Sequence, residues 1–196
     1  MSICETVIHH PPVFQPEMAT TFLEWWFDGL PDGQFINLRM IRDKEPRSAQ
    51  NYFFTTPKKL VEVASKARAP WGTFFGVCPR KAQDGSKEAI EYLPGYWCDI
   101  DCGDEEESRR AVESRVASIQ PQPDQIVGTP GGFHLYWRFK EREEIIFPSD
   151  IVKWEGKMAG IAAALGGDPA CKDLSRVLRL PGSVHFKGEP KGVVAL

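Results

Sequence analysis

The sequence predicts an α+β fold, and three patterns along the chain lead to that prediction. Apolar residues alternate with other residues over 34–41, so that every second side chain from Ile36 to Met40 would share one face of a strand. Apolar residues recur at i, i+3 and i+4 over 149–165, which is the spacing of an amphipathic helix. A glycine-rich stretch at 128–132 separates two strand-like segments, as in two strands joined by a turn. Both kinds of segment therefore occur in one chain.

The composition is that of one globular domain. The chain has 196 residues, 42% hydrophobic and 26% charged, which is sufficient for a hydrophobic core. A net charge of −3 and a pI near 5.9 are unlike a protein that wraps duplex DNA, so any nucleic-acid contact must be local or made through metal-bound nucleotide. No long apolar run or signal-peptide pattern occurs, so we expect a cytoplasmic protein without a membrane partner. Five cysteines without a CxxC pair argue against a disulfide framework and a zinc site.

In the first half of the chain we expect a lead-in, three strands and one helix. Residues 1–19 show no periodicity and are expected to be peripheral. The helix is expected to begin at Thr56-Pro57, because proline suits the first helical position. The strand patterns cover residues 34–41, 51–54 and 72–78.

In the second half, strands and helices alternate. The acidic run at 104–107 suits the first turn of a helix, because the helix macrodipole favours carboxylates there. Strands are expected at 126–127 and 133–139, on either side of the glycine turn. We expect Ser149 to cap the last helix and the glycines at 166–167 to end it.

Two carboxylates one residue apart, at the end of an apolar strand, are the central feature of the sequence. In an extended strand, Asp99 and Asp101 would lie on one face while Cys98 and Ile100 face a core. Two ionised carboxylates ~6 Å apart repel by roughly 3 kcal/mol at an effective dielectric near 20. A divalent cation removes that cost, and aspartate oxygens suit Mg²⁺ or Mn²⁺ beside substrate phosphates. A strand end at which both aspartates reach water is the alternative.

A histidine follows the glycine turn directly. Along 133–139, His134, Tyr136 and Arg138 would share a polar face, and the residues between them an apolar one. Because the amides of such a turn can hold an anion, His134 suits a phosphate ligand beside the aspartate pair. A hydrogen-bonded structural histidine is the alternative.

A third cluster, near the C-terminus, combines two carboxylates with several cations. Asp168 and Asp173 precede the cations, which places one further metal ligand beside them. Phosphoryl transfer to or from a metal-bound triphosphate requires this combination, since it depends on positioning and charge stabilisation. A basic surface segment with scattered aspartates would have the same pattern. The cationic side chains are Arg176, Arg179, His185 and Lys187.

These features form three motifs in a fixed order. The first is a strand ending in Asp-x-Asp at 97–101, and the second is a small-residue turn followed by His at 129–134. The third, at 168–187, is an Asp eight residues ahead of Arg-x-x-Arg-x-Pro-Gly-Ser-x-His-x-Lys. Together they resemble the archaeo-eukaryotic primase superfamily, in particular the primase-polymerases of plasmids, phages and CRISPR-linked loci. The resemblance covers about residues 72–187, whereas residues 1–70 carry no motif that we can assign to a family.

The resemblance implies the archaeo-eukaryotic primase fold. In that fold an RRM-like βαββ sheet carries the catalytic aspartates and packs against an N-terminal αβ subdomain, and residues 90–139 have the matching β-α-β-β order. We therefore expect one primase-polymerase catalytic domain over 1–196. Its expected parts are a lead-in at 1–19, an N-terminal αβ subdomain at 20–88 and an RRM-like catalytic subdomain at 89–196.

The resemblance also implies which residues bind metal. Asp99, Asp101 and Asp168 would be catalytic and would hold two Mg²⁺ or Mn²⁺ ions. Asp173 is the alternative third ligand, because it too lies just ahead of Arg176. The spacing to the arginines favours Asp168.

Further residues are implied to bind the incoming nucleotide. Where the family often has Ser-Gly in its second motif, this chain has Thr129-Pro130, which puts a hydroxyl contact to phosphate in question. The nucleotide-binding residues would be Arg80, Gly132, His134, Arg176, Arg179, Ser183, His185 and Lys187.

The implied activity is that of a DNA primase-polymerase, which transfers nucleotides from NTP or dNTP to a 3'-hydroxyl on single-stranded DNA and releases pyrophosphate.

Residues 192–196 look like a strand without a stop signal, so we expect a longer chain, with a helicase or a CRISPR integration protein fused or associated. A two-metal nuclease is an alternative, but it has no use for the segment at 179–187. An RRM-like binding module would carry aromatics on its central strands. A replication-initiation domain of primase fold with limited catalysis is a further alternative.

Overall fold

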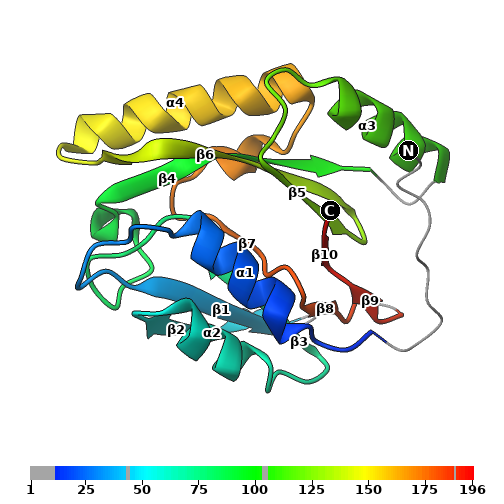
Figure 1. Cartoon of the computed structure of the whole chain (residues 1–196), viewed down its shortest axis with the longest axis horizontal. Helices are drawn as coiled ribbons and strands as arrows, with labels where there is room; N and C mark the ends of the chain where they lie inside the picture. Colours follow the sequence, from blue (N-terminus) through cyan, green and yellow to red (C-terminus); the bar gives the residue numbers. More distant parts are fainter. Residues whose placement is uncertain (1–11, 43–44, 103–105, 188) are drawn as a thin grey trace.

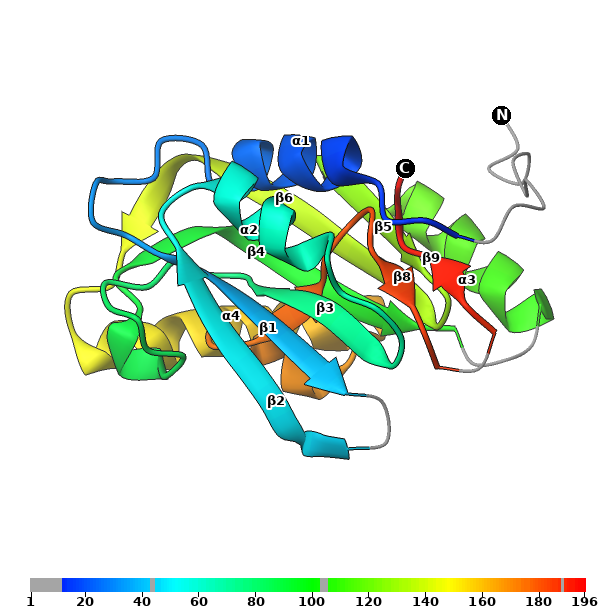
Figure 2. The same cartoon turned by 90° about the horizontal axis from the view of Figure 1, so that it is seen from below.

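Two four-stranded sheets form the framework of the computed structural model, which describes residues 12–42, 45–102, 106–187 and 189–196. The first sheet has the order β2-β1-β3-β7, and its neighbouring strands are antiparallel. Helices α1 and α2 lie next to each other beside it, as both views show (Figure 1, Figure 2). These elements are α1 (Pro16–Trp26), β1 (Ile36–Arg42), β2 (Glu45–Phe54), α2 (Pro57–Ala64), β3 (Trp71–Gly76) and β7 (Val177–Arg179).

The second sheet has the order β10-β5-β6-β4 and is again antiparallel. Helices α3 and α4 lie along one side of it, and α1 lies between the two sheets (Figure 1). The predicted α+β class is therefore confirmed. The elements are β4 (Tyr92–Asp101), α3 (Glu106–Ser118), β5 (Gln125–Thr129), β6 (Gly132–Glu144), α4 (Pro148–Leu165) and β10 (Val194–Ala195), with a separate pair β8 (Val184–His185) and β9 (Lys191–Gly192) and short 3₁₀ turns η1 (Lys87–Ala89) and η2 (Pro169–Lys172).

Helix α1 corrects the prediction of a peripheral lead-in over 1–19. The helix begins at Pro16, and Ala19 is fully buried. The apolar side of α1 carries large aromatic residues, which fill the space between the two sheets. The indole of Trp26 also donates a hydrogen bond to the carbonyl of Val77 (2.8 Å). Residues 1–11 lie outside the described part of the chain.

The first sheet contains strands from both sides of the predicted subdomain boundary near residue 88. Strand β7 lies in the segment that we assigned to the catalytic subdomain, yet it extends the first sheet by pairing Phe74 with Arg179 and Phe75 with Leu178. Pairing with β7 covers the free edge of β3, which would otherwise leave backbone groups unpaired. The first sheet is therefore built from both ends of the chain.

Two of the helix ends lie where the sequence predicted them, and one predicted cap residue is wrong. Thr56 caps α2 by accepting a hydrogen bond from the Lys59 amide (3.4 Å), and Gly166 ends α4 in the left-handed conformation (φ 64°). Ser149 lies inside α4, so the predicted cap is wrong. The carboxylate of Asp150 instead accepts from the amide of Phe147 (2.9 Å). Helix α3 is described from Glu106, and the earlier part of the acidic run lies outside the described residues.

Strands β4 and β6 are covered on both faces. Cys98 and Ile100 pack with α3 and α4, as predicted, but Tyr136 is also fully buried, in the larger cluster around Phe22 and Phe75. The face of residues 133–139 that we predicted to be polar is therefore buried at His134 and Tyr136, because α1 and the first sheet cover it. The four described cysteines are buried and free. Among the described helices, none combines the length and the hydrophobicity needed to cross a bilayer.

Candidate active site

The pairing of β4 with β6 brings the first two motifs together. Asp99 lies directly opposite His134, with 3.6 Å between Oδ1 and Nε2, and Asp101 lies opposite Gly132. A Cβ on Gly132 would stand 1.9 Å from the carbonyl oxygen of Ile100. Glycine at this position therefore allows the β5–β6 turn to approach the aspartate strand.

The third motif joins the first through a backbone contact. The amide of Asp168 donates a hydrogen bond to the carbonyl of Asp99 (2.7 Å). This contact depends on Gly167, since a Cβ there would lie 2.4 Å from Cys98 Sγ and 2.8 Å from the Asp99 carbonyl oxygen. We had assigned Gly167 only to the end of α4. Two consecutive glycines ahead of an acidic residue were the available signal for its second role.

Arg176 connects the two carboxylates that this contact brings together. Its Nη2 lies 2.8 Å from Oδ2 of Asp168 and 3.8 Å from Oδ2 of Asp99. Asp168 also begins the η2 turn, where its other oxygen accepts from the Ala170 amide (2.8 Å). The cluster therefore contains one cation between two acids that are 69 residues apart in the sequence.

The alternative third ligand, Asp173, has different partners. Its carboxylate accepts from the amide and the hydroxyl of Ser175 (2.8 and 2.7 Å) and lies 3.5 Å from Lys87 Nζ. Partial burial works to raise the pKa of Asp173, but the Ser175 hydrogen bonds and Lys87 outweigh it and lower the pKa. Of the two candidates, Asp168 is the one whose carboxylate shares an arginine with Asp99.

Burial and crowding shift the pKa values at the site in opposite directions. Burial, reinforced by the charge of Asp168, raises the pKa of Asp99 to about 6 in spite of Arg176 and Arg179. Desolvation and the two neighbouring aspartates also raise the pKa of Asp101. Burial, helped by both arginines, lowers the pKa of His134 to about 3, so its imidazole is neutral at pH 7.

The cluster suits a divalent cation by its donor chemistry. Carboxylate oxygens are the ligands that Mg²⁺ and Mn²⁺ prefer. Burial is the main cause of the raised pKa values of Asp99 and Asp101, and a bound cation would stabilise the charged carboxylates that burial disfavours. In the part of the chain that the structure describes, no three His, Cys, Asp or Glu side chains are grouped closely enough to hold a metal ion. Two of the three carboxylates are paired with Arg176 instead.

Comparison with known proteins identifies the family. The family model described as the RepB DNA-primase N-terminal domain matches residues 79–195, which is more than half of the chain. The chain belongs to this primase family. The match includes all three motifs, so the predicted membership of the archaeo-eukaryotic primase superfamily is confirmed. A search of curated protein sequences finds no match.

Two solved structures share the fold of this primase domain. One is the AEP domain of the primase-polymerase of cyanophage S-2L, with a TM-score of 0.67 and 18% identity over 94% of this chain and 91% of that one. The other is the catalytic domain of primase RepB' in complex with initiator DNA, with a TM-score of 0.58 and 12% identity over 92% of this chain and 83% of that one. The archaeo-eukaryotic primase fold predicted from the sequence is therefore confirmed.

One predicted nucleotide contact of the primase domain is wrong. Arg80 is fully buried, and its guanidinium donates hydrogen bonds to the carbonyls of Cys78 (2.7 Å) and Ser175 (3.4 Å). It fastens the end of β3 to the segment that leads into β7. A side chain with no accessible surface cannot contact a nucleotide or a template.

The remaining predicted contacts of the third motif lie on or beside β8, next to β3. Ser183 is buried, and its Oγ has no hydrogen-bond partner among the described residues. His185 is partly exposed and Lys187 is exposed. The hydroxyl of Thr129, in the second motif, donates to the carbonyl of Gly132 (3.2 Å) and so serves the turn.

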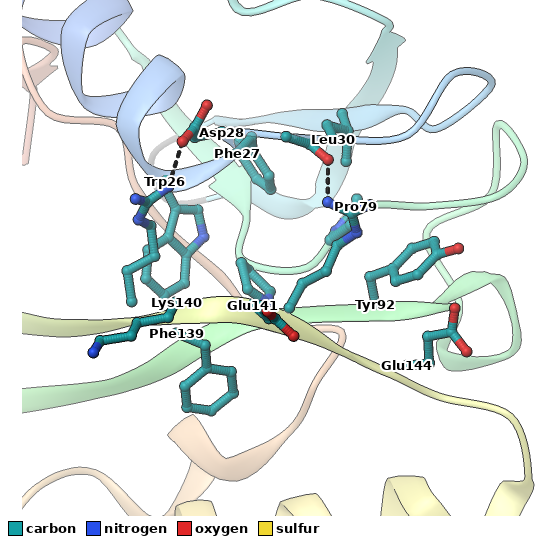
Figure 3. A pocket seen from close by; sticks show the side chains of 14 residues that line it. Trp26, Phe27, Asp28, Leu30, Pro79, Tyr92, Phe139, Lys140, Glu141 and Glu144 are labelled. Atoms are coloured by element: carbon teal, nitrogen blue, oxygen red, sulfur yellow. Dashed lines mark hydrogen bonds and ion pairs between the residues drawn. The ribbon is translucent and has the colours of Figure 1, made fainter.

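A cavity of about 490 Å³ lies away from the acidic cluster of the primase domain (Figure 3). It is formed where α1 ends, near the start of β4 and the second half of β6, so several strand positions separate it from Asp99. Asp28 and Arg138 pair across it (3.0 Å), and Trp26 and Tyr92 are among its lining residues. None of the three motif aspartates lines this cavity.

Proposed function

We propose that this primase domain is a primase-polymerase that copies single-stranded DNA. It would transfer nucleotides from NTP or dNTP to a 3'-hydroxyl and release pyrophosphate. The observation that carries the proposal is the contact of Asp168 with Asp99, reinforced by Arg176, because it joins the third motif to the first, which already lies opposite His134 of the second. Membership of the RepB DNA-primase family supports the same activity.

The proposed site would hold two divalent cations on Asp99, Asp101 and Asp168. Such ions, when bound, lower the pKa of the attacking hydroxyl and neutralise the triphosphate. The protein supplies the rest of the positive charge. Arg176 and Arg179, which already act electrostatically on Asp99, would stabilise the negative charge of the transferring phosphate.

His134 would contribute a hydrogen bond and no charge. A neutral imidazole has one N–H donor and one acceptor nitrogen. The Nδ1 of His134 is buried, whereas Nε2 lies 3.6 Å from Oδ1 of Asp99, and the carboxylate favours the proton on Nε2. A phosphate oxygen is the kind of acceptor that would satisfy the donor. His185 and Lys187 are proposed to complete the phosphate contacts, and Gly132 to form the turn behind them. The predicted contact of Ser183 is withdrawn, because its Oγ is buried in the same way as the Arg80 side chain.

A primer-synthesis assay tests the proposal. The chain is incubated with a circular single-stranded DNA, labelled NTP or dNTP, and Mn²⁺ or Mg²⁺, with and without an annealed primer. We expect products that are lost in EDTA and in Asp99→Asn and Asp101→Asn. Products without a primer would establish initiation, and products only from the primer would restrict the activity to polymerisation. Nucleotide binding without product in every condition would contradict the proposal and favour a non-catalytic replication-initiation domain. Degradation of the DNA would favour the nuclease.

Further partners are proposed from the resemblance alone. Because the chain resembles the primase-polymerases of plasmids, phages and CRISPR-linked loci, we propose that a helicase or a CRISPR integration protein is fused to it or associates with it. Co-expression with such a protein, followed by size-exclusion chromatography, would test for a stable complex.

A further inference from the structure

One face of the first sheet carries a row of four side chains that the active-site motifs do not explain. Residues directly opposite each other on neighbouring strands share a face. Asn51 on β2 lies opposite Arg39 on β1, Arg39 lies opposite Phe74 on β3, and Phe74 lies opposite Arg179 on β7. We call these four residues, Asn51, Arg39, Phe74 and Arg179, the cross-strand row.

The row lies on the open side of the sheet. Leu38 and Phe75, which point to the opposite face, are fully buried in the cluster that includes Leu60 and Val61 of α2. In the row, by contrast, Asn51 is exposed and the other three side chains are partly exposed. The two faces of this sheet therefore differ, and only one is used for packing against helices.

A glycine next to Phe74 on β3 lets the aromatic ring and an arginine of the row pack closely against the strand. On β3 the open face has Gly72, Phe74 and Gly76 in succession, because alternate residues share a face. A Cβ on Gly72 would lie 3.2 Å from both the ring of Phe74 and Nη1 of Arg179. The ring of Phe74 and the guanidinium of Arg179 therefore both lie over Gly72, while Asn37 and Arg80 lie over Gly76.

The row is also cationic, although the whole chain carries a net charge of −3. The guanidinium of Arg179 lies over the Phe74 ring, 4.6 Å from its centroid. The Nε of Arg39 is buried and has no hydrogen-bond partner among the described residues. A partly exposed aromatic ring between two arginines is the combination that stacks bases and neutralises phosphates in single-stranded nucleic acids.

Arg179 connects the row to the active site. It lies three residues after Arg176, whose guanidinium contacts both Asp168 and Asp99, so one end of the row lies near the acidic cluster. The row crosses three strand spacings of about 4.8 Å, or about 14 Å in all. At 3.4 Å or more per nucleotide along one strand, this length is more than a single nucleotide requires.

We propose that the cross-strand row binds the single-stranded template as it approaches the active site. A base stacks on Phe74, and Arg39 and Asn51 contact the backbone of the strand on the side away from the aspartates. The inference rests on the proposed function, because it names the part of the same site that receives the template.

Binding of a labelled oligonucleotide tests the row directly. Fluorescence anisotropy of a 12-nucleotide single strand, as DNA and as RNA, is measured with the whole chain in EDTA without nucleotide. Phe74→Ala is expected to raise Kd about 5- to 150-fold, the usual effect of losing one stacked base. Arg39→Gln is expected to lower the slope of log K against log salt by about 0.7, the value for one phosphate contact on a single strand.

The matched controls lie on the covered side of the same sheet. Tyr52 is exposed and lies opposite Leu38, and Lys58 is an exposed residue of α2. Tyr52→Ala and Lys58→Ala remove an aromatic ring and a positive charge, and Kd should change less than twofold. Phe74→Leu keeps an apolar side chain without a planar ring and should bind as weakly as Phe74→Ala. Thermal unfolding identifies any variant that fails to fold. If Phe74→Ala does not fold, the binding of Phe74→Leu and Arg39→Gln decides the test.

The outcomes separate this inference from the proposed function. Unchanged oligonucleotide binding in the folded Phe74 and Arg39 variants would overturn the inference, even if the parent protein synthesises primers. So would tighter binding of duplex than of single strands. A loss confined to dNTP binding would overturn it as well, because Phe74 would then receive the incoming base. Weakened oligonucleotide binding in a protein that makes no product would support the inference and contradict the proposed activity.

Discussion

Asp168 and Asp173 occupy equivalent local positions at the two ends of the same turn. Both have extended backbone conformations, with φ and ψ of −62° and 117° for Asp168 and −64° and 119° for Asp173. Each carboxylate accepts a hydrogen bond from the amide two residues further on, at 2.8 Å in both cases. Local structure therefore gives no basis for choosing between them.

The tertiary contacts of the two residues are different. The amide of Asp168 is hydrogen-bonded to the carbonyl of Asp99, and its carboxylate pairs with Arg176. The carboxylate of Asp173 pairs with Lys87, which is also bound by Glu155 of α4. The comparison indicates that the backbone contact of Asp168 with Asp99, which depends on Gly167, distinguishes the proposed metal ligand from Asp173.

The largest expected effect separates the two aspartates by activity. Asp168→Asn should lower kcat/KM for primer extension at least about 10³-fold, because losing one charged ligand of a metal site costs about 4 kcal/mol of transition-state stabilisation. Asp173→Asn should change it less than about threefold. Steady-state extension of an annealed primer measures both. Equal losses in the two variants, with both folded, would contradict the distinction.

A smaller effect is expected from disturbing the contact that makes Asp168 different. Gly167→Ala places a methyl group against Cys98 Sγ and the Asp99 carbonyl, and should destabilise the fold by about 1–3 kcal/mol, the usual cost of overpacking. Gly160→Ala, at an exposed position of α4 with nothing within 4 Å, should stabilise by up to about 1 kcal/mol. Urea unfolding compares the two. If Gly167→Ala were as stable as the parent and fully active, the close approach would be unnecessary.

Much of this site could be predicted from the sequence, because its residues belong to short motifs. The Asp-x-Asp pair lies on one strand and the His134 turn on its neighbour, so the alternation of the strands fixes which side chains meet. The apolar side of β4 was also correct, because Cys98 and Ile100 contact helices that the sequence already indicated.

The errors arose where a distant element decides whether a position is exposed. Tyr136 was assigned to a polar face because it alternates with apolar residues and shares that face with His134 and Arg138. The packing of α1 and β3 buries it. Arg80 looked available because arginine is rarely buried, but two backbone carbonyls accept its hydrogen bonds. The row that includes Phe74 could not be found before the register of β1, β3 and β7 was known.

The smallest expected effect concerns pH, because Asp99 and Asp173 respond to it with opposite signs. The pKa of Asp99 is raised to about 6, so between pH 3.8 and 6 the native protein keeps a proton that the unfolded chain has released, and stability falls as the pH rises. The pKa of Asp173 is lowered, so its contribution is present above pH 3.8 and is lost as the pH falls. His134 opposes Asp99, since its pKa of about 3 makes stability rise between pH 3 and 6.5.

Asp99 and His134 each change the free energy of unfolding by at most about 1.4 kcal/mol per pH unit, with opposite signs. In the parent protein the two contributions therefore nearly cancel between pH 4 and 6. Urea unfolding in EDTA should therefore show stability rising with pH over this range in Asp99→Asn and falling in His134→Gln, each relative to the parent. Asp173→Asn should lose stability above pH 4, where the ionised carboxylate contributes. If Asp99→Asn and His134→Gln both followed the parent curve, neither group would have the buried environment described here. The acidic cluster would then be as well solvated as the Asp173 site, and the need for a cation to stabilise it would disappear.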